Sequence, residues 1–352
     1  MKYLELYEEL RNDIITGVYP YSARLPSKRT LADKAGISVI TAEHALALLM
    51  DEGYIESRER SGYFVIYSEN RIFGKPERTS RMPLPHLPGR IPEESFPLSV
   101  LAKTMRKVLS DYGEEILKKS PNTGTQELRN AIAKYLRRSR KMDVNPERII
   151  IGAGAEYLYS FIIQIIGRDK IYAIEDPSYE KIERVYSANS AAFERLPLGN
   201  DGIKSDALQK SKADVLHITP YRSFPSGVTA SASKKREYII HAKKTGMIIV
   251  EDDFESEFTL SKKSEETVFS LSESDNVIYL NTFSKTVAPS VRMGYLVLPE
   301  SLFDSFIKNA GFYSCTVPTF EQFVMARLIE NGDFERHINS VRRKRNKIKN
   351  FE

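Results

Sequence analysis

The sequence predicts an α/β protein in which a largely parallel sheet, with helices on both faces, follows a small winged helix-turn-helix domain. Three short helical segments and two strand-like runs fill the first 70 residues. From about residue 98 onward, runs rich in β-branched residues alternate with helical stretches, the spacing of a parallel sheet. At 352 residues the chain is long enough for more than one domain. We therefore divide it into a winged helix-turn-helix domain (1–68), a linker (69–97) and a larger domain (98–352).

The N-terminal domain is predicted to contain three helices and a hairpin. Apolar residues recur at helical spacing up to Gly17, which can end the first helix. Ser27 and Ser38 are suitable N-caps for a second and a third helix. The third helix is expected to bury one face, made of Val39, Ala42, Ala45, Leu46 and Leu49. Two strand-like runs, 54–58 and 62–66, complete the domain as a hairpin.

Net charge does not assign a partner to this domain. Residues 1–70 hold 8 Lys and Arg against 11 Asp and Glu. Basic residues nevertheless flank the second helix and the hairpin, at Arg24, Lys28, Arg29, Arg58 and Arg60. A net-acidic module can still present a basic face to DNA, because phosphate contacts depend on where the charges lie. The pattern leaves two alternatives, DNA binding and a small helical domain with solvated charges.

The rest of the chain is predicted to form a linker and a sheet. Residues 69–97 lose periodicity and alternate basic residues with prolines, which favours a semi-extended linker. Beyond it, β-rich runs occupy 149–151, 171–174, 215–218, 247–250, 277–280 and 294–298. Helical stretches such as 156–166 and 233–244 separate several of them. Ligands of such sheets bind at the carboxyl ends of the strands.

A group of residues around Lys285 predicts the chemistry of the larger domain. Lys285 lies between hydroxyl residues, seven residues before Arg292 and 33 residues after Asp252, the first acid of a pair that ends an apolar run. A lysine can form a Schiff base with an aldehyde cofactor, and hydroxyls and an arginine can hold its phosphate. An acid can keep a pyridinium nitrogen protonated. Alone, Lys285 would be a surface lysine, but together these groups predict a pyridoxal phosphate site.

Two further candidates follow other predicted strands. Gly152-Ala153-Gly154-Ala155 opens a helix, where backbone N–H groups can cradle a phosphate. Tyr179 follows the next strand and can either stack on an aromatic ring or fill the core.

The N-terminal segments 24–32, 36–38, 51–55 and 60–65 resemble the DNA-binding domain of the GntR family. The resemblance implies DNA contacts from Arg24, Ser27, Lys28, Arg29, Ser38, Thr41, Arg60 and Gly62. Val39 stands where that family often has an arginine, so the resemblance does not carry over an operator sequence.

The larger domain resembles the aminotransferase-like, fold-type I pyridoxal phosphate proteins. Joined to a GntR module, it looks like the MocR subfamily of transcription regulators. By that resemblance Lys285 forms the Schiff base, Asp252 pairs with the pyridine nitrogen, and Tyr179 stacks on the ring. The residues implied around the phosphate are Ala153, Gly154, Thr282 and Arg292. The resemblance also implies a homodimer.

Three departures from the family pattern bear on function. Phe254 replaces a tyrosine whose hydroxyl would lie near the cofactor's phenolic oxygen. Tyr221-Arg222-Ser223 replaces the more usual Ser-His-Gln. The chain ends at Glu352, before the small C-terminal domain that carries an arginine for a substrate carboxylate in the family, so either this protein is truncated or the sequence is part of a longer one. Arg222 and Arg184 are candidate replacements for that arginine.

We therefore expect a regulator, not an enzyme, whose aminotransferase-like domain binds pyridoxal phosphate and senses it or an amino compound. The alternatives are an aminotransferase with an accessory DNA-binding domain and a DNA-binding scaffold that has lost the cofactor. The expected partners are double-stranded operator DNA and a small-molecule effector, with no metal. A single cysteine, Cys315, an N-terminus without an apolar leader and the lack of a long apolar run predict a cytoplasmic protein that does not cross a membrane.

Overall fold

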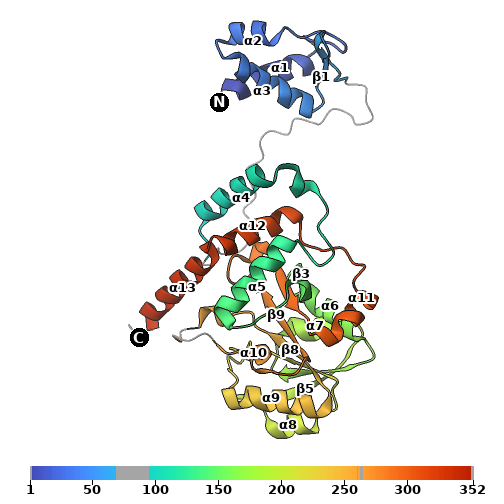
Figure 1. Cartoon of the computed structure of the whole chain (residues 1–352), viewed down its shortest axis with the longest axis vertical. Helices are drawn as coiled ribbons and strands as arrows, with labels where there is room; N and C mark the ends of the chain where they lie inside the picture. Colours follow the sequence, from blue (N-terminus) through green and yellow to red (C-terminus); the bar gives the residue numbers. More distant parts are fainter. Residues whose placement is uncertain (1, 69–94, 260, 262–264, 350–352) are drawn as a thin grey trace. The chain divides into compact units, whose positions relative to one another are not determined.

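The computed structural model describes residues 2–68, 95–259, 261 and 265–349. The chain divides into two compact units, Met1–Gly89 and Arg90–Glu352 (Figure 1). Of the segment predicted to be a linker, residues 69–94 lie outside the described part of the chain. Within the described residues, no helix combines the length and the apolar composition that crossing a membrane requires.

The N-terminal unit has the predicted three helices and hairpin. Its elements are α1 (Lys2–Ile15), α2 (Lys28–Ala35), α3 (Val39–Asp51), β1 (Ile55–Arg58) and β2 (Gly62–Val65). Ser27 and Ser38 cap α2 and α3, because each side-chain oxygen accepts a hydrogen bond from the backbone N–H three residues on. Gly36 ends α2 in the left-handed conformation, with φ of 63°.

The core of this unit corrects one expectation. Ala42, Ala45, Leu46 and Leu49 of α3 are fully buried, as the helical period predicts. Val39 was expected on the same face, but it is 36% exposed. It is the first residue of α3, where no preceding turn of helix covers it.

The described residues of the larger unit contain one sheet of eight strands in the order β3-β10-β9-β8-β7-β4-β5-β6. Their bounds are β3 (Ile149–Gly152), β4 (Ile171–Asp176), β5 (Ala192–Gly199), β6 (Gly202–Ile203), β7 (Val215–Ile218), β8 (Ile248–Asp252), β9 (Val277–Thr282) and β10 (Gly294–Val297). The pairs from β9 through β5 are parallel, which confirms the prediction of a mostly parallel sheet. β10 runs antiparallel to both of its neighbours.

Two strands, β5 and β6, were not predicted from the sequence. β5 contains Glu194, Arg195 and Pro197, and only Leu196 among its residues is buried. Such a strand near the edge of a sheet has too few apolar residues for the alternation that identifies a half-buried strand. β6 has two residues, which is too short for any periodic signal.

Helices cover both faces of this sheet (Figure 1). They are α4 (Leu98–Tyr112), α5 (Gln126–Arg140), α6 (Ala155–Ile166), α7 (Glu180–Ala188), α8 (Ser205–Lys210), α9 (Ala232–Thr245), α10 (Val268–Leu271), α11 (Phe303–Asn309), α12 (Thr319–Glu330) and α13 (Asp333–Lys349). Adjacent residues of β3 point into different cores, since Ile151 packs with α5 and α12 whereas Ile150 packs with α6 and α11. This sandwich holds the carboxyl ends of β8 and β9 beside the start of α6.

Candidate functional site

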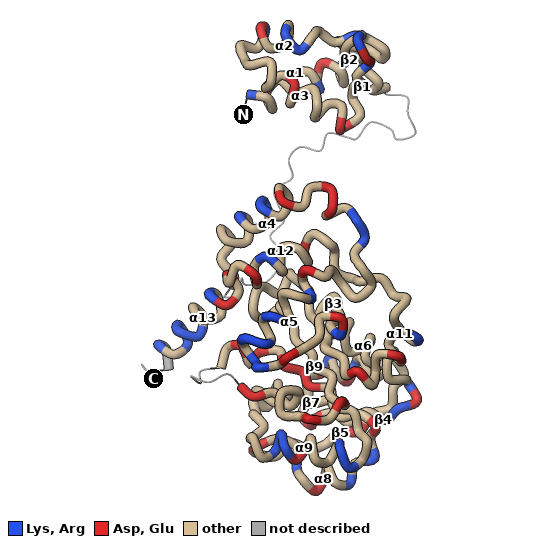
Figure 2. Tube along the Cα trace, viewed as in Figure 1, with Lys and Arg blue, Asp and Glu red and all other residues tan. Residues whose placement is uncertain are grey.

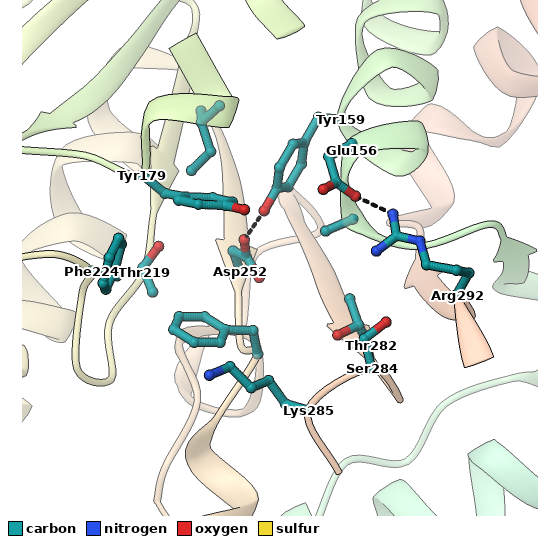
Figure 3. A pocket seen from close by; sticks show the side chains of 13 residues that line it. Glu156, Tyr159, Tyr179, Thr219, Phe224, Asp252, Thr282, Ser284, Lys285 and Arg292 are labelled. Carbon is teal, nitrogen blue, oxygen red and sulfur yellow. Dashed lines mark hydrogen bonds and ion pairs between the residues drawn. The ribbon is translucent and has the colours of Figure 1, made fainter. Parts of the chain in front are cut away.

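A cavity of about 290 Å³ lies where β8 and β9 end, next to the N-terminus of α6. Five of the seven residues expected to hold a cofactor line it, namely Tyr179, Asp252, Thr282, Lys285 and Arg292. Tyr179, Asp252 and the segment from Thr282 to Arg292 lie far apart in the sequence, and the sheet brings them together (Figure 3). The cavity is therefore the candidate site.

Asp252, the last residue of β8, supplies a buried carboxyl group to the cavity. The hydroxyl of Tyr159, from α6, donates a hydrogen bond to its Oδ2 (Figure 3). No described residue donates to Oδ1. Burial raises the pKa of Asp252 to about 7, although the bond from Tyr159 acts in the opposite direction. An unpartnered carboxylate oxygen in a buried site suits a cationic hydrogen-bond donor on a ligand.

The neighbouring acid, Asp253, faces a different environment. It accepts a hydrogen bond of 2.8 Å from the hydroxyl of Tyr279 and lies 3.3 Å from the guanidinium of Arg140. Successive side chains along a strand point to opposite faces of the sheet, which separates the two carboxylates. Only one of the two acids noted in the sequence therefore lines the cavity.

The other end of the cavity has groups suited to a phosphate. Gly154 is the N-cap of α6 with φ of 88°, and a Cβ atom there would lie 2.9 Å from Nη2 of Arg292. Ala155, in the first turn, lines the cavity beside the hydroxyl residues Thr282 and Ser284. The Ser284 hydroxyl has no hydrogen-bond partner among the described residues. A helix N-terminus, two hydroxyl groups and a guanidinium together attract an anion.

Ala153 and Gly154 do not line the cavity themselves. The backbone N–H of Ala153 donates a 3.0 Å hydrogen bond to the side chain of Thr316, so it is already occupied. Gly154 acts by leaving space for Arg292, as the Cβ distance indicates.

Lys285 and Tyr179 complete the cavity wall. Lys285 is exposed, and no described residue forms an ion pair or a hydrogen bond with its ammonium group. In Figure 3 its side chain extends into the space below Asp252 and Tyr179. The ring of Tyr179 meets Phe224 edge-on at 5.9 Å between centroids. Phe254, which replaces the tyrosine usual in the family that the chain resembles, lines the same cavity.

The sequence did not identify two residues of the site, Tyr159 and Glu156. Tyr159 lies four residues after Ala155, so the helical period places it on the cavity face of α6. Glu156 accepts hydrogen bonds from Arg292 and from Lys181. Partial burial alone would raise the pKa of Glu156, but these two cations lower it to about 2. The guanidinium that was expected to hold the phosphate is therefore paired with a carboxylate of the protein.

A buried pair of residues, Tyr186 and His217, lies behind Asp252. The hydroxyl of Tyr186 is 2.8 Å from Nδ1 of His217, and Nε2 of His217 is 4.0 Å from Oδ2 of Asp252. Burial lowers the pKa of His217 to about 3, so its ring is neutral. This pair adds no positive charge beside Asp252.

The two arginines considered as replacements for a substrate clamp lie outside the cavity lining. Arg222 is 3.5 Å from the carboxylate of Glu255, and Arg184 pairs with Glu180 within α7.

The residues expected to contact DNA gather on one unit, and most are exposed. Figure 2 shows Lys and Arg on α2 and beside the β1–β2 hairpin. Arg24, Arg29 and Arg60 are exposed, whereas the Lys28 ammonium lies 2.9 Å from the carboxylate of Glu43. Ser27, Ser38 and Thr41 take part in the helix caps. Gly62 has φ of 104° and lies against the side chain of Arg24.

Comparisons with known proteins account for both units. Residues 92–350 match the class I and II aminotransferases, and residues 2–65 match the gntR family of bacterial regulatory proteins. The chain is 30% identical over 352 residues to the uncharacterized HTH-type transcriptional regulator YdeL of Bacillus subtilis (strain 168), across 97% of this chain and 76% of YdeL. It is 29% identical over 366 residues to the probable rhizopine catabolism regulatory protein MocR of Rhizobium meliloti, across 96% of this chain and 74% of MocR.

Among solved structures, the multiple substrate aminotransferase of Thermococcus profundus matches with a TM-score of 0.66 and 24% identity. That match covers 72% of this chain and 65% of the aminotransferase, just under two thirds of its length. The likeness to this enzyme gives the fold of the larger unit, whereas the regulators match both units in the same order. The chain belongs to the MocR-type regulators of the GntR family, DNA-binding transcription regulators in which a winged helix-turn-helix domain precedes an aminotransferase class I and II domain.

Proposed function

We propose that this regulator binds pyridoxal phosphate in the cavity beside Lys285 and couples that binding, or the reaction of the cofactor with an amino compound, to operator binding. One observation carries the proposal. The unpartnered Oδ1 of Asp252 belongs to the same cavity as the free ammonium of Lys285 and the guanidinium of Arg292. This set of groups fits the ring nitrogen, the aldehyde and the phosphate of the cofactor.

Each residue has a separate role in this proposal. Lys285 supplies the amine that bonds covalently to the cofactor, which then provides an electron sink for chemistry at an amino group. Asp252, oriented by Tyr159, holds a proton on the ring nitrogen. Arg292, Thr282 and the start of α6 bind the phosphate. Tyr179 packs against one face of the ring.

The cofactor test uses the purified full chain titrated with pyridoxal phosphate and followed by visible absorption. The expected result is a saturable yellow band that borohydride bleaches and that Lys285→Ala lacks. Lys308→Ala, a change to an exposed lysine of α11, is the matched control and should keep the band. A wild-type chain without the band, or a Lys285→Ala chain that retains it, would contradict the proposal.

A second function, aminotransferase activity with an accessory DNA-binding domain, is favoured by the lysine, the acid and the arginine that line the cavity. The two functions differ in turnover. A regulator is expected to shift its cofactor spectrum once with an amino acid and then stop. Sustained conversion of an amino acid and a 2-oxo acid, on the order of 1 per second or faster, would favour the enzyme.

The proposal also includes a homodimer, because two-fold symmetric proteins bind paired half-sites of an operator. Light scattering of the full chain in solution measures this directly. A mass of one chain at the concentrations used for DNA binding would contradict the dimer.

A further inference from the structure

The start of α3 exposes two adjacent apolar side chains. Val39 is 36% exposed and Ile40 is 67% exposed, directly after the N-cap Ser38. Single apolar residues on a surface are ordinary, but these two stand at one end of the second helix of a helix-turn-helix. In that motif the N-terminal residues of the second helix contact base edges in the major groove of DNA.

The outward face of α3 has few groups that read bases by hydrogen bonds. Its sequence, Val39–Asp51, contains no Lys, Arg, Asn or Gln. Those four residue types make the bidentate contacts that identify guanine and adenine. The hydroxyl of Thr41 lies 2.8 Å from that of Ser38, and the carboxylate of Glu43 is paired with Lys28. Readout by this helix therefore depends on something other than bidentate hydrogen bonds.

Exposed cations on the same domain favour DNA as the partner of this helix. Arg29 on α2, Arg24 before it and Arg60 in the hairpin are exposed. Phosphate contacts from such residues hold a protein on the duplex without reading its sequence. Exposed apolar side chains at the start of such a helix suit the major groove, because there the apolar feature is the C5-methyl group of thymine.

We propose that Val39 and Ile40 recognise thymine C5-methyl groups in the major groove, so that each operator half-site is read at these positions by apolar contact. The proposal rests on the assignment of the chain as a DNA-binding regulator. It predicts that thymine is required where the start of α3 meets the bases, and that uracil, which lacks only the methyl group, is a poorer substitute.

The test first selects binding sites for the full chain from a pool of random duplexes. Each thymine of the selected site is then replaced by deoxyuridine, one position at a time, and affinity is measured by fluorescence anisotropy at constant salt. One or two positions should lose about fourfold in affinity, the scale of one buried methylene group. In Ile40→Ala or Val39→Ala, the same replacement should have a smaller effect or none, since the partner of the methyl group is gone.

Val18→Ala is the matched control, because Val18 is 64% exposed and belongs to neither α2 nor α3. It should keep the wild-type response to deoxyuridine. Ile40→Ala is an exposed change in a helix, so an unaltered melting temperature is expected and checks that the variant folds.

The outcomes distinguish a failure of DNA binding from a failure of the methyl contact. A chain that enriches no sequence and binds no duplex would overturn the assignment of DNA binding. A chain that binds a selected site equally well with thymine or with uracil at every position would overturn only the methyl contact. A selected site without thymine would also overturn it, as would a response to deoxyuridine at one position that is unchanged in both Val39→Ala and Ile40→Ala.

Discussion

Replacing Asp252 by asparagine should have opposite effects on folding and on cofactor binding. The carboxyl group is buried and its pKa is about 7, compared with an ordinary value of 3.8. Because the folded-state pKa is raised, the unfolded chain loses this proton first as pH rises. The wild-type protein therefore loses stability between about pH 4 and about pH 7, and asparagine, which does not ionise, avoids that loss.

The magnitude follows from the shift in pKa. Each pKa unit corresponds to about 1.4 kcal/mol, so titration between about pH 4.5 and about pH 7 costs the wild type about 3 kcal/mol. Without cofactor, we therefore compare the free energy of unfolding of Asp252→Asn with that of wild type at two pH values. The difference, variant minus wild type, should be about 3 kcal/mol larger at about pH 8 than at about pH 4.5. Tyr159 can still donate its hydrogen bond to the amide oxygen of the asparagine.

Cofactor binding should change in the other direction. The asparagine offers no negative charge to a protonated ring nitrogen, and hydrogen bonds to charged groups contribute about 1.5–3 kcal/mol. We expect the affinity for pyridoxal phosphate to fall at least about tenfold.

Urea unfolding of the cofactor-free protein, followed by circular dichroism at the two pH values, and a spectroscopic titration of the cofactor measure the two effects. Asp253→Asn is the matched comparison. Its carboxylate is 3.3 Å from Arg140, away from the cavity lining, so that variant should lose about 3 kcal/mol of stability. If Asp252→Asn is instead less stable than wild type by the same amount at both pH values, Asp252 is a structural acid and the reasoning is refuted.

Three further predictions concern other charged groups. Alanine at both Arg29 and Arg60 should weaken operator binding by at least about 1 kcal/mol and reduce its dependence on salt, measured by anisotropy; unchanged binding would exclude both as phosphate contacts. Glu156→Gln should tighten binding of inorganic phosphate roughly fivefold in calorimetry by freeing Arg292, and weaker binding would contradict this. Burial raises the pKa of Glu175 to about 8, so wild type loses stability as this carboxyl ionises and Glu175→Gln does not. In urea unfolding, the stability of the variant relative to wild type should rise by about 4 kcal/mol between about pH 5 and about pH 9, and a constant difference would contradict this.

The parts of the protein that could be predicted from the sequence are those that local chemistry determines. Ser27 and Ser38 cap helices because their side chains reach their own backbone, which any sequence with that local pattern can do. The central strands were predicted because most of their residues are apolar, as burial on both faces of a sheet requires. Lys285, Asp252 and Arg292 were grouped because an amine, an acid and a guanidinium at this spacing together match the groups of one cofactor, although each alone is an ordinary residue.

The remaining features depend on which elements meet in space. Neither the hydrogen bond from Tyr159 to Asp252 nor the contact between Glu156 and Arg292 has a local signature, because their partners are 93 and 136 residues apart. The exposure of Val39 illustrates the same limit on a smaller scale. Its spacing in the sequence fits the buried face of α3, but the first turn of a helix has no preceding turn to cover it, so the core begins only at Ala42. Val39 is therefore left exposed at the N-terminal end of α3, the end at which helix-turn-helix proteins contact bases.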